Sequence, residues 1–137
     1  MNRPHPLPLR ALVMATAFVS STGALAQTYP AKPVRLVIAQ AAGSATDTAG
    51  RILAQELADA LGQQVVVDNR AGAGGVIGAE HAAKAVPDGY TLLLANISTH
   101  GVNPALYRKL PYDALRSFAP VSMVSITPNV LVVHPSL

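Results

Sequence analysis

Two polar loops of this sequence carry the residue types that a small anionic ligand needs. The first loop, residues 40–47, reads Gln-Ala-Ala-Gly-Ser-Ala-Thr-Asp and opens a predicted helix. Small side chains let backbone N–H groups approach a ligand, and the first turn of a helix carries partial positive charge that attracts anions. The candidate ligand-binding residues here are Gly43, Ser44, Ala45, Thr46 and Asp47. The alternative is that Thr46 or Asp47 simply caps the helix.

The second loop, residues 96–101, reads Asn-Ile-Ser-Thr-His-Gly and follows a predicted strand. Because it is rich in hydroxyl and amide groups, we assign Asn96, Ser98, Thr99 and His100 to the same candidate ligand site. The imidazole of His100 would also suit a general base or a metal ligand. The alternative is a histidine that is hydrogen-bonded within its loop. No pair of histidines has the spacing of a metal site, so we predict no metal.

Glycines are concentrated in a third segment, residues 70–78. The segment does not fit the G-x-G-x-x-G pattern of dinucleotide-binding proteins: counted from Gly72, Ile77 takes the place of the third glycine, and counted from Gly74, Val76 takes the place of the second. A tight turn with close helix packing is the simpler interpretation. Ser44 lacks a G-x-S-x-G context, and no close pair of carboxylates suggests acid–base catalysis. We therefore predict a binding protein with no catalytic residues and no cofactor.

These loops need a scaffold that brings the ends of several strands together. Apolar runs of strand length lie at residues 34–39, 65–69 and 90–95, and helical periods at residues 47–61 and 76–85 separate them. This alternation predicts an α/β fold with a mostly parallel sheet and helices on both faces. Ligands of such sheets bind beyond the carboxyl ends of the strands, where both polar loops lie.

The predicted elements also include details that a structure can test. Gly62 is expected to end the first helix, since glycine tolerates the left-handed conformation. One helical turn is expected at residues 104–107, and two further strands at residues 119–126 and 129–134. The apolar face expected for the first helix consists of Ala49, Ile52, Leu53, Leu57, Ala60 and Leu61.

Residues 1–26 have the three parts of a secretory signal peptide. A head with Arg3 and Arg10 precedes a short apolar stretch, and Ala24-Leu-Ala26 provides a cleavage site. The alternative is an amphipathic or anchoring helix, but the apolar stretch is about half of the roughly 20 residues that span a bilayer. We predict cleavage after Ala26 and a periplasmic location.

The composition excludes several classes of protein. The chain has 137 residues, with ten Lys and Arg, seven Asp and Glu, and no cysteine. It therefore has no disulfide scaffold and no Cys-ligated zinc module. Removal of residues 1–26 leaves eight basic and seven acidic residues, scattered rather than clustered. A nucleic-acid partner needs clustered Lys and Arg, so we predict none.

Several segments after residue 26 form a distinctive collinear set. They read YPAKPVRLV (29–37), GSATD (43–47), LGQQVVVDNRAGAGG (61–75), PDGYTLLL (87–94), NPALYRKLPYD (103–113), FAPV (118–121) and PNVLVV (128–133). This set resembles the Bug family, the TctC-like periplasmic solute receptors of tripartite tricarboxylate transporters. The resemblance covers essentially all of the chain after residue 26.

The resemblance implies a monomeric periplasmic binding protein with two α/β lobes and a ligand cleft between them. It also implies capture of small carboxylates and their delivery to the permease subunits of the transporter. Gly43, Ala45, Thr46 and Asp47 fit the family's first ligand loop position by position. Backbone amides there would hold a carboxylate, and Asp47 would orient bound water. From the second loop, Thr99 is the expected contact.

The sequence also departs from the family pattern. Ala39, Gln40, Ala41 and Ala42 stand where the family favours prolines and an aromatic residue, and Ser44 replaces the usual second glycine. Losing the prolines should loosen the loop and raise the entropic cost of binding. Family members are longer, so residues 27–137 are expected to form an incomplete N-terminal lobe, truncated before the second lobe. The alternatives are an exported signalling or interaction module derived from such a receptor, and a small exported hydrolase that uses His100.

Overall fold

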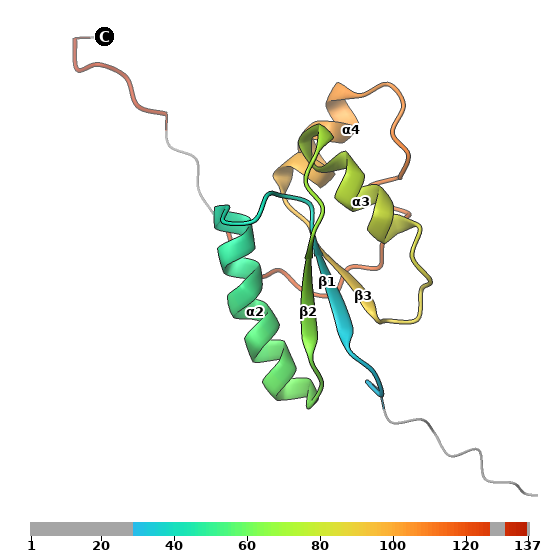
Figure 1. The fold of residues 1–137 in the computed structure, drawn as a ribbon. Helices are drawn as coiled ribbons and strands as arrows, with labels where there is room; N and C mark the ends of the chain where they lie inside the picture. The colour runs from blue at the N-terminus through green and yellow to red at the C-terminus, as the bar shows by residue number, and fades with distance from the viewer. Residues whose placement is uncertain (1–28, 127–130, 137) are drawn as a thin grey trace, which may run out of the picture.

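The computed structural model of the chain describes residues 29–126 and 131–136 (Figure 1). Its centre is a three-stranded parallel sheet in the order β2-β1-β3, built from β1 (Val34–Ile38), β2 (Val65–Asn69) and β3 (Thr91–Leu94). In this register Leu36 of β1 lies opposite Val67 of β2 and Leu92 of β3. The predicted α/β class and all three of these strands are confirmed.

Helices cover both faces of the sheet (Figure 1). α2 (Ala45–Leu61) packs on the face formed by Val34, Leu36 and Ile38. α3 (Val76–Ala83) packs on the opposite face, where Gly78 lies against Ala39. Successive side chains of a strand point to opposite faces, so β1 is covered on both sides. This double burial explains why four of its five residues are buried and apolar.

The apolar face expected for α2 is wrong in part. Ala49, Ile52 and Ala60 are exposed, Ile52 to 63%. The residues that pack on the sheet are spaced three and four apart: Gly50, Leu53, Ala54, Leu57, Ala58 and Leu61. The helix approaches the sheet so closely at Gly50 that an added Cβ would collide with the Ile38 side chain. Ile52 lies about 200° around the helix from Gly50 and therefore faces away from the sheet.

We expect Gly78→Ala to destabilise the protein, although alanine is the better helix former by about 1 kcal/mol. A Cβ at Gly78 would lie 2.7 Å from Ala39 Cα and 2.8 Å from the carbonyl oxygen of Arg70. Both atoms belong to the backbone, which no change of rotamer can move. Overpacking costs up to about 3 kcal/mol, so the free energy of unfolding should fall by about 2 kcal/mol in urea titration.

The matched control for this substitution is Gly101→Ala. A Cβ at Gly101 would approach only a side-chain atom of Ile97, at 3.3 Å. We expect this variant to match or exceed the wild type in stability, because alanine keeps its helical advantage. Equal stability of Gly78→Ala and the wild type would show that α3 can move away from β1 without loss.

The chain beyond β3 is helical at first and then irregular. η2 (Ser98–Val102) runs into α4 (Asn103–Leu106), which confirms the single turn expected at residues 104–107 to within one residue. The strand predicted at residues 119–126 is wrong, because a strand needs a neighbour to pair with and no described residue pairs with this segment. Residues 131–134 of the last predicted strand form no strand either, and residues 129–130 lie outside the described residues.

The predicted signal peptide and its cleavage site also lie outside the described residues. Within residues 29–126 and 131–136, no helix combines the length and apolar character needed to cross a membrane.

Candidate ligand-binding site

Three loops meet at the carboxyl edge of the sheet. β1 leads into the first loop (residues 40–47), β2 into the glycine loop (residues 70–75) and β3 into the second loop (residues 96–101). The glycine loop lies against the second loop and against the end of β1, since a Cβ added at Gly75 would lie 2.9 Å from Thr99 Cγ2 and 3.3 Å from the carbonyl oxygen of Ala39. The structure thus brings both predicted polar loops to the edge where open α/β sheets bind their ligands.

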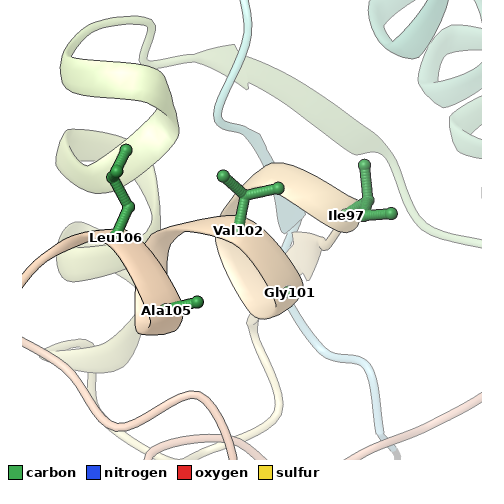
Figure 2. Close-up of a pocket in the computed structure, with 5 residues that line it drawn as sticks. All are labelled: Ile97, Gly101, Val102, Ala105 and Leu106. Carbon is green, nitrogen blue, oxygen red and sulfur yellow. The ribbon is translucent and has the colours of Figure 1, made fainter.

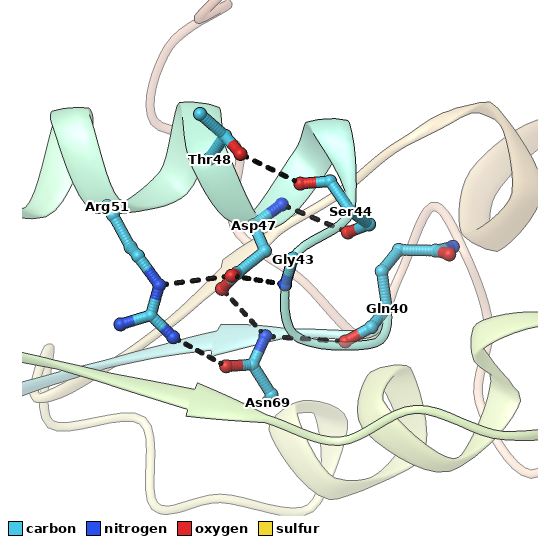
Figure 3. Close-up of polar contacts among 7 residues, drawn as sticks. All are labelled: Gln40, Gly43, Ser44, Asp47, Thr48, Arg51 and Asn69. Carbon is cyan, nitrogen blue, oxygen red and sulfur yellow. Dashed lines mark hydrogen bonds and ion pairs between the residues drawn. The ribbon is translucent and has the colours of Figure 1, made fainter.

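Ser44 caps α2 (Figure 3). Its backbone is extended, and its Oγ accepts a hydrogen bond of 3.2 Å from the N–H of Asp47. The prediction that Thr46 or Asp47 would be the cap is therefore wrong: α2 begins at Ala45, two residues before the expected start, and both residues lie inside its first turn. Ser44 thus has a structural role of its own.

The Asp47 carboxylate turns back into the first loop and is 3% exposed. Oδ2 accepts hydrogen bonds from the N–H of Gly43 at 2.8 Å and from Arg51 Nε at 3.0 Å, and Oδ1 accepts one from Asn69 Nδ2 at 2.9 Å. The N–H of Gly43 first, and then Arg51 and Asn69, lower the pKa of Asp47 from 3.8 to about 2. The carboxylate is therefore ionised at neutral pH, and it holds the loop closed against β2.

Sequence reasoning missed Arg51 and Asn69, which complete this network (Figure 3). Arg51 lies one helical turn after Asp47, and its Nη2 donates to Asn69 Oδ1 at 3.1 Å. Asn69 Nδ2 also approaches the carbonyl oxygen of Gln40 at 3.3 Å. Two signals were available: the Asp-x-x-x-Arg spacing on a helix, and an asparagine at the carboxyl end of the neighbouring strand.

The first turn of α2 keeps two backbone donors available. Within the described residues, the N–H groups of Gly43, Ser44 and Asp47 have acceptors, whereas those of Ala45 and Thr46 have none. Ala45 is exposed and Thr46 is half-buried. Adjacent N–H groups at a helix N-terminus suit a carboxylate, because they add their own dipoles to that of the helix.

The second loop is organised by a reciprocal pair of hydrogen bonds. Asn96 Oδ1 accepts from the N–H of Thr99, and Thr99 Oγ1 accepts from the N–H of Asn96, both at 3.1 Å. This is the geometry of a capping box, and it starts the helical stretch that contains η2. Thr99 is fully buried, whereas Asn96 and Ser98 are half-buried.

His100 is hydrogen-bonded within its loop, which is the alternative raised from the sequence. Its Nδ1 lies 2.9 Å from Thr99 Oγ1, and its ring packs 4.9 Å from that of Phe118. Burial lowers its pKa below the usual value of 6.5, so the neutral form is favoured. Within the described part of the chain, no group of three His, Cys, Asp or Glu residues is placed to hold a metal ion.

A shallow apolar depression lies beside the second loop (Figure 2). It is lined by Ile97, Gly101, Val102, Ala105 and Leu106. Ile97 and Leu106 are about two-thirds exposed, at 70% and 68%. These side chains have no polar group, so the depression cannot itself pair with a carboxylate.

Residues 49–137 match the tripartite tricarboxylate transporter family receptor. The chain belongs to this family. All of it aligns with protein BugT of Bordetella pertussis (strain Tohama I), with 45% identity over 138 residues, and it spans 42% of that protein. The Bug resemblance seen in the sequence is confirmed.

Two solved structures of ligand-bound proteins are also similar to the chain. MatC from Rhodopseudomonas palustris with bound malate has a TM-score of 0.67 and 40% identity, covering 70% of this chain and 33% of MatC. A second R. palustris protein, solved with adipate, has a TM-score of 0.61 and 37% identity, covering 63% of this chain and 29% of that protein. The described residues thus have the fold of one part of a periplasmic-binding-protein-like molecule.

Family membership decides between two of the sequence-based hypotheses. The family model describes a receptor, and a similar solved structure is that of the periplasmic binding protein BugD. This confirms the prediction that the chain is not an enzyme, and it removes the hydrolase that would use His100. Membership also supports a periplasmic location. The exported signalling or interaction module remains a hypothesis.

Proposed function

We propose that the protein carrying this sequence captures a small di- or tricarboxylate in the periplasm and delivers it to the permease subunits of a tripartite tricarboxylate transporter. The observation that carries this proposal is the pair of N–H groups without acceptors in the described residues, those of Ala45 and Thr46. They lie at the start of α2, on a loop held by the Asp47 network. The malate and adipate of the two similar proteins support the same class of ligand.

In this proposal the N–H groups of Ala45 and Thr46 donate to one carboxylate of the ligand. Gly43 and Ser44 shape the loop beneath it, because the N–H of Gly43 is held by Asp47 and Ser44 caps the helix. Asp47 meets the ligand only through bound water, and the Arg51 guanidinium offsets its charge. Because Arg51 offsets the charge of Asp47, an anionic ligand can bind close to this buried carboxylate.

The second loop forms the other side of the proposed site. The Thr99 hydroxyl is already engaged by Asn96 and His100. Thr99 therefore acts mainly by fixing the loop, and Ser98, Asn96 and His100, which are half-buried, are the side chains offered to the ligand. Nε2 is the ring nitrogen of His100 that is left for the ligand, because Nδ1 is engaged by the Thr99 hydroxyl.

The remaining expectations complete the proposal. Residues 1–26 are a signal peptide cleaved after Ala26, and residues 27–137 belong to the N-terminal lobe of a monomeric receptor. The chain spans less than half of BugT, so a second lobe in a protein of that length would close the cleft over the ligand.

Isothermal titration calorimetry of the full natural protein, identified by intact mass from a periplasmic extract, tests this function. Malate, adipate and citrate should bind, with at least one in the micromolar range, and a monocarboxylate such as acetate should give no heat. The reason is that a second carboxylate adds charge-assisted hydrogen bonds. Absence of heat with every di- and tricarboxylate, and absence of a co-purified acid in native mass spectrometry, would refute the proposal.

A further inference from the structure

A buried polar network lies beneath the carboxyl edge of the sheet, outside the candidate ligand residues except for Thr99. Thr99, Asn103 and Tyr112 are 0%, 3% and 7% exposed. Polar side chains are costly to bury unless they are hydrogen-bonded. The contacts that these three residues make therefore indicate what the network holds in place.

The network joins two backbone carbonyl groups on different loops. Asn103 Nδ2 donates to the carbonyl oxygen of Gly74, 29 residues away, at 3.0 Å. The Tyr112 hydroxyl donates to the carbonyl oxygen of Thr99 at 2.7 Å, and Asn103 Nδ2 approaches the same hydroxyl at 3.5 Å. Gly74 belongs to the glycine loop and Thr99 to the second loop, so Asn103 and Tyr112 link the two loops.

The internal structure of the glycine loop is one short 3-10 turn, η1 (Ala73–Gly75), to which the link adds a contact from outside the loop. Four consecutive residues, 72–75, have positive φ, including Ala73 at 48°. The N–H of Gly75 donates to the carbonyl oxygen of Gly72 at 2.9 Å, and the N–H of Val76 donates to the carbonyl oxygen of Ala73. A residue such as Ala73 keeps a left-handed conformation only where its surroundings impose it. The Asn103 contact at Gly74 supplies that constraint from outside the loop.

We propose that Asn103 and Tyr112 are positioning residues that hold the glycine loop at a fixed distance from the second loop. This inference rests on the proposed function in one respect: the second loop forms one side of the proposed ligand site, so fixing its position sets which length of dicarboxylate fits. The Gly75–Thr99 approach limits how closely the loops can come together, and the Asn103–Gly74 hydrogen bond prevents them from separating. Removal of the link should therefore reduce the selectivity among dicarboxylates of different length, in addition to lowering the affinity.

The test uses Tyr112→Phe, which deletes one hydroxyl, and Asn103→Ala, which deletes the contact with Gly74. The control is Tyr107→Phe, since Tyr107 is 42% exposed and lies in the same segment. In the full natural protein we expect Tyr112→Phe to lower the affinity for the preferred dicarboxylate roughly tenfold. Across a series from malonate to adipate, the ratio of best to worst affinity should fall by at least threefold. If Asn103→Ala does not fold, the affinities and the hydrogen exchange of Tyr112→Phe are sufficient for the test.

Hydrogen exchange measured without ligand separates the two proposals. We expect amides of residues 72–76 to exchange at least threefold faster in Tyr112→Phe than in the wild type or in Tyr107→Phe. The inference would be overturned if Tyr112→Phe lowered the melting temperature or the affinity but left both the affinity ratio and the exchange of residues 72–76 unchanged. Tyr112 would then have a purely structural role. If the wild type binds no dicarboxylate, the proposed function fails, and faster exchange at residues 72–76 still supports the link between the loops while unchanged exchange refutes it.

Discussion

Replacing Asp47 with asparagine is expected to destabilise the first loop and to abolish measurable carboxylate binding. Three donors converge on this carboxylate: the N–H of Gly43, Arg51 Nε and Asn69 Nδ2. An amide has a single acceptor oxygen and an N–H₂ group in place of the other oxygen, so at least one of the three donors must lose its acceptor and face a donor instead. Because a buried donor without an acceptor is costly, the melting temperature should fall by roughly 5 °C or more.

The control for this substitution is Asp59→Asn in the same helix. Asp59 is exposed, and among the described residues the one hydrogen bond that its carboxylate accepts is from Gln55 Nε2, at 3.1 Å. Its replacement should change the melting temperature by no more than about 2 °C, since surface substitutions have small effects. Equal melting temperatures and equal affinities for Asp47→Asn and Asp59→Asn would mean that the loop does not depend on the Asp47 network.

The same carboxylate gives the wild type a defined sensitivity to acid. The folded-state pKa of Asp47 is about 2, below its ordinary value of 3.8. The unfolded chain therefore takes up a proton more readily, and folding stability must fall as the carboxylate is protonated. The contribution of Asp47 is complete above about pH 4 and is lost as the pH falls towards 2. Asp47→Asn should lack this part of the acid transition in a pH series of melting temperatures.

The elements that sequence reasoning predicted well depend on local chemistry. The run of Val, Leu and Ile in β1 is typical of a strand covered on both faces. Gly62 marks the end of α2 because a left-handed residue, here with φ of 64°, favours glycine wherever it occurs. Parallel topology then follows from the alternation of strands and helices, and it places both polar loops at one edge.

The elements that were not predicted depend on contacts between distant residues. Composition favoured the large side chain of Ile52, but α2 approaches β1 through Gly50, where the Ile38 side chain leaves no room for a Cβ. Similarly, residues 119–126 have the composition of a strand, yet no described strand pairs with them. Composition indicates what a segment prefers, and a partner elsewhere in the chain decides whether it forms.

The candidate site also combines features that local sequence predicts with features that depend on contacts between distant residues. Its position at the carboxyl edge could be predicted, because topology alone determines it. The residues that fix its shape could not, because Asn69 reaches Asp47 across 22 residues and Asn103 reaches Gly74 across 29. Spacing along one helix reveals a pair such as Asp47 and Arg51, but it carries no information about loops that meet only after folding.

The second large effect is expected from Ala45→Pro, which removes a single N–H group from the proposed carboxylate site. Ala45 is the first residue of α2, where a helix has no internal partner for the N–H and where proline is favoured. Ser44 already has the extended backbone that precedes a proline, with ψ of 163°. The melting temperature without ligand should therefore stay the same or rise slightly.

Affinity for the preferred dicarboxylate should nevertheless fall roughly 10- to 100-fold, since a hydrogen bond to a charged group contributes about 1.5–3 kcal/mol. The control is Ala45→Ser, which keeps the N–H group at the same exposed position and should bind like the wild type. Calorimetry measures the affinities, and thermal unfolding without ligand shows whether the loop is intact. Wild-type affinity in Ala45→Pro would exclude the start of α2 from the site, whereas a fall in melting temperature would show that the proline had disturbed the loop itself. A loss of affinity at unchanged stability would place the N–H of Ala45 in the ligand site, because the proline ring removes this donor and occupies the position of its hydrogen bond while the loop stays intact.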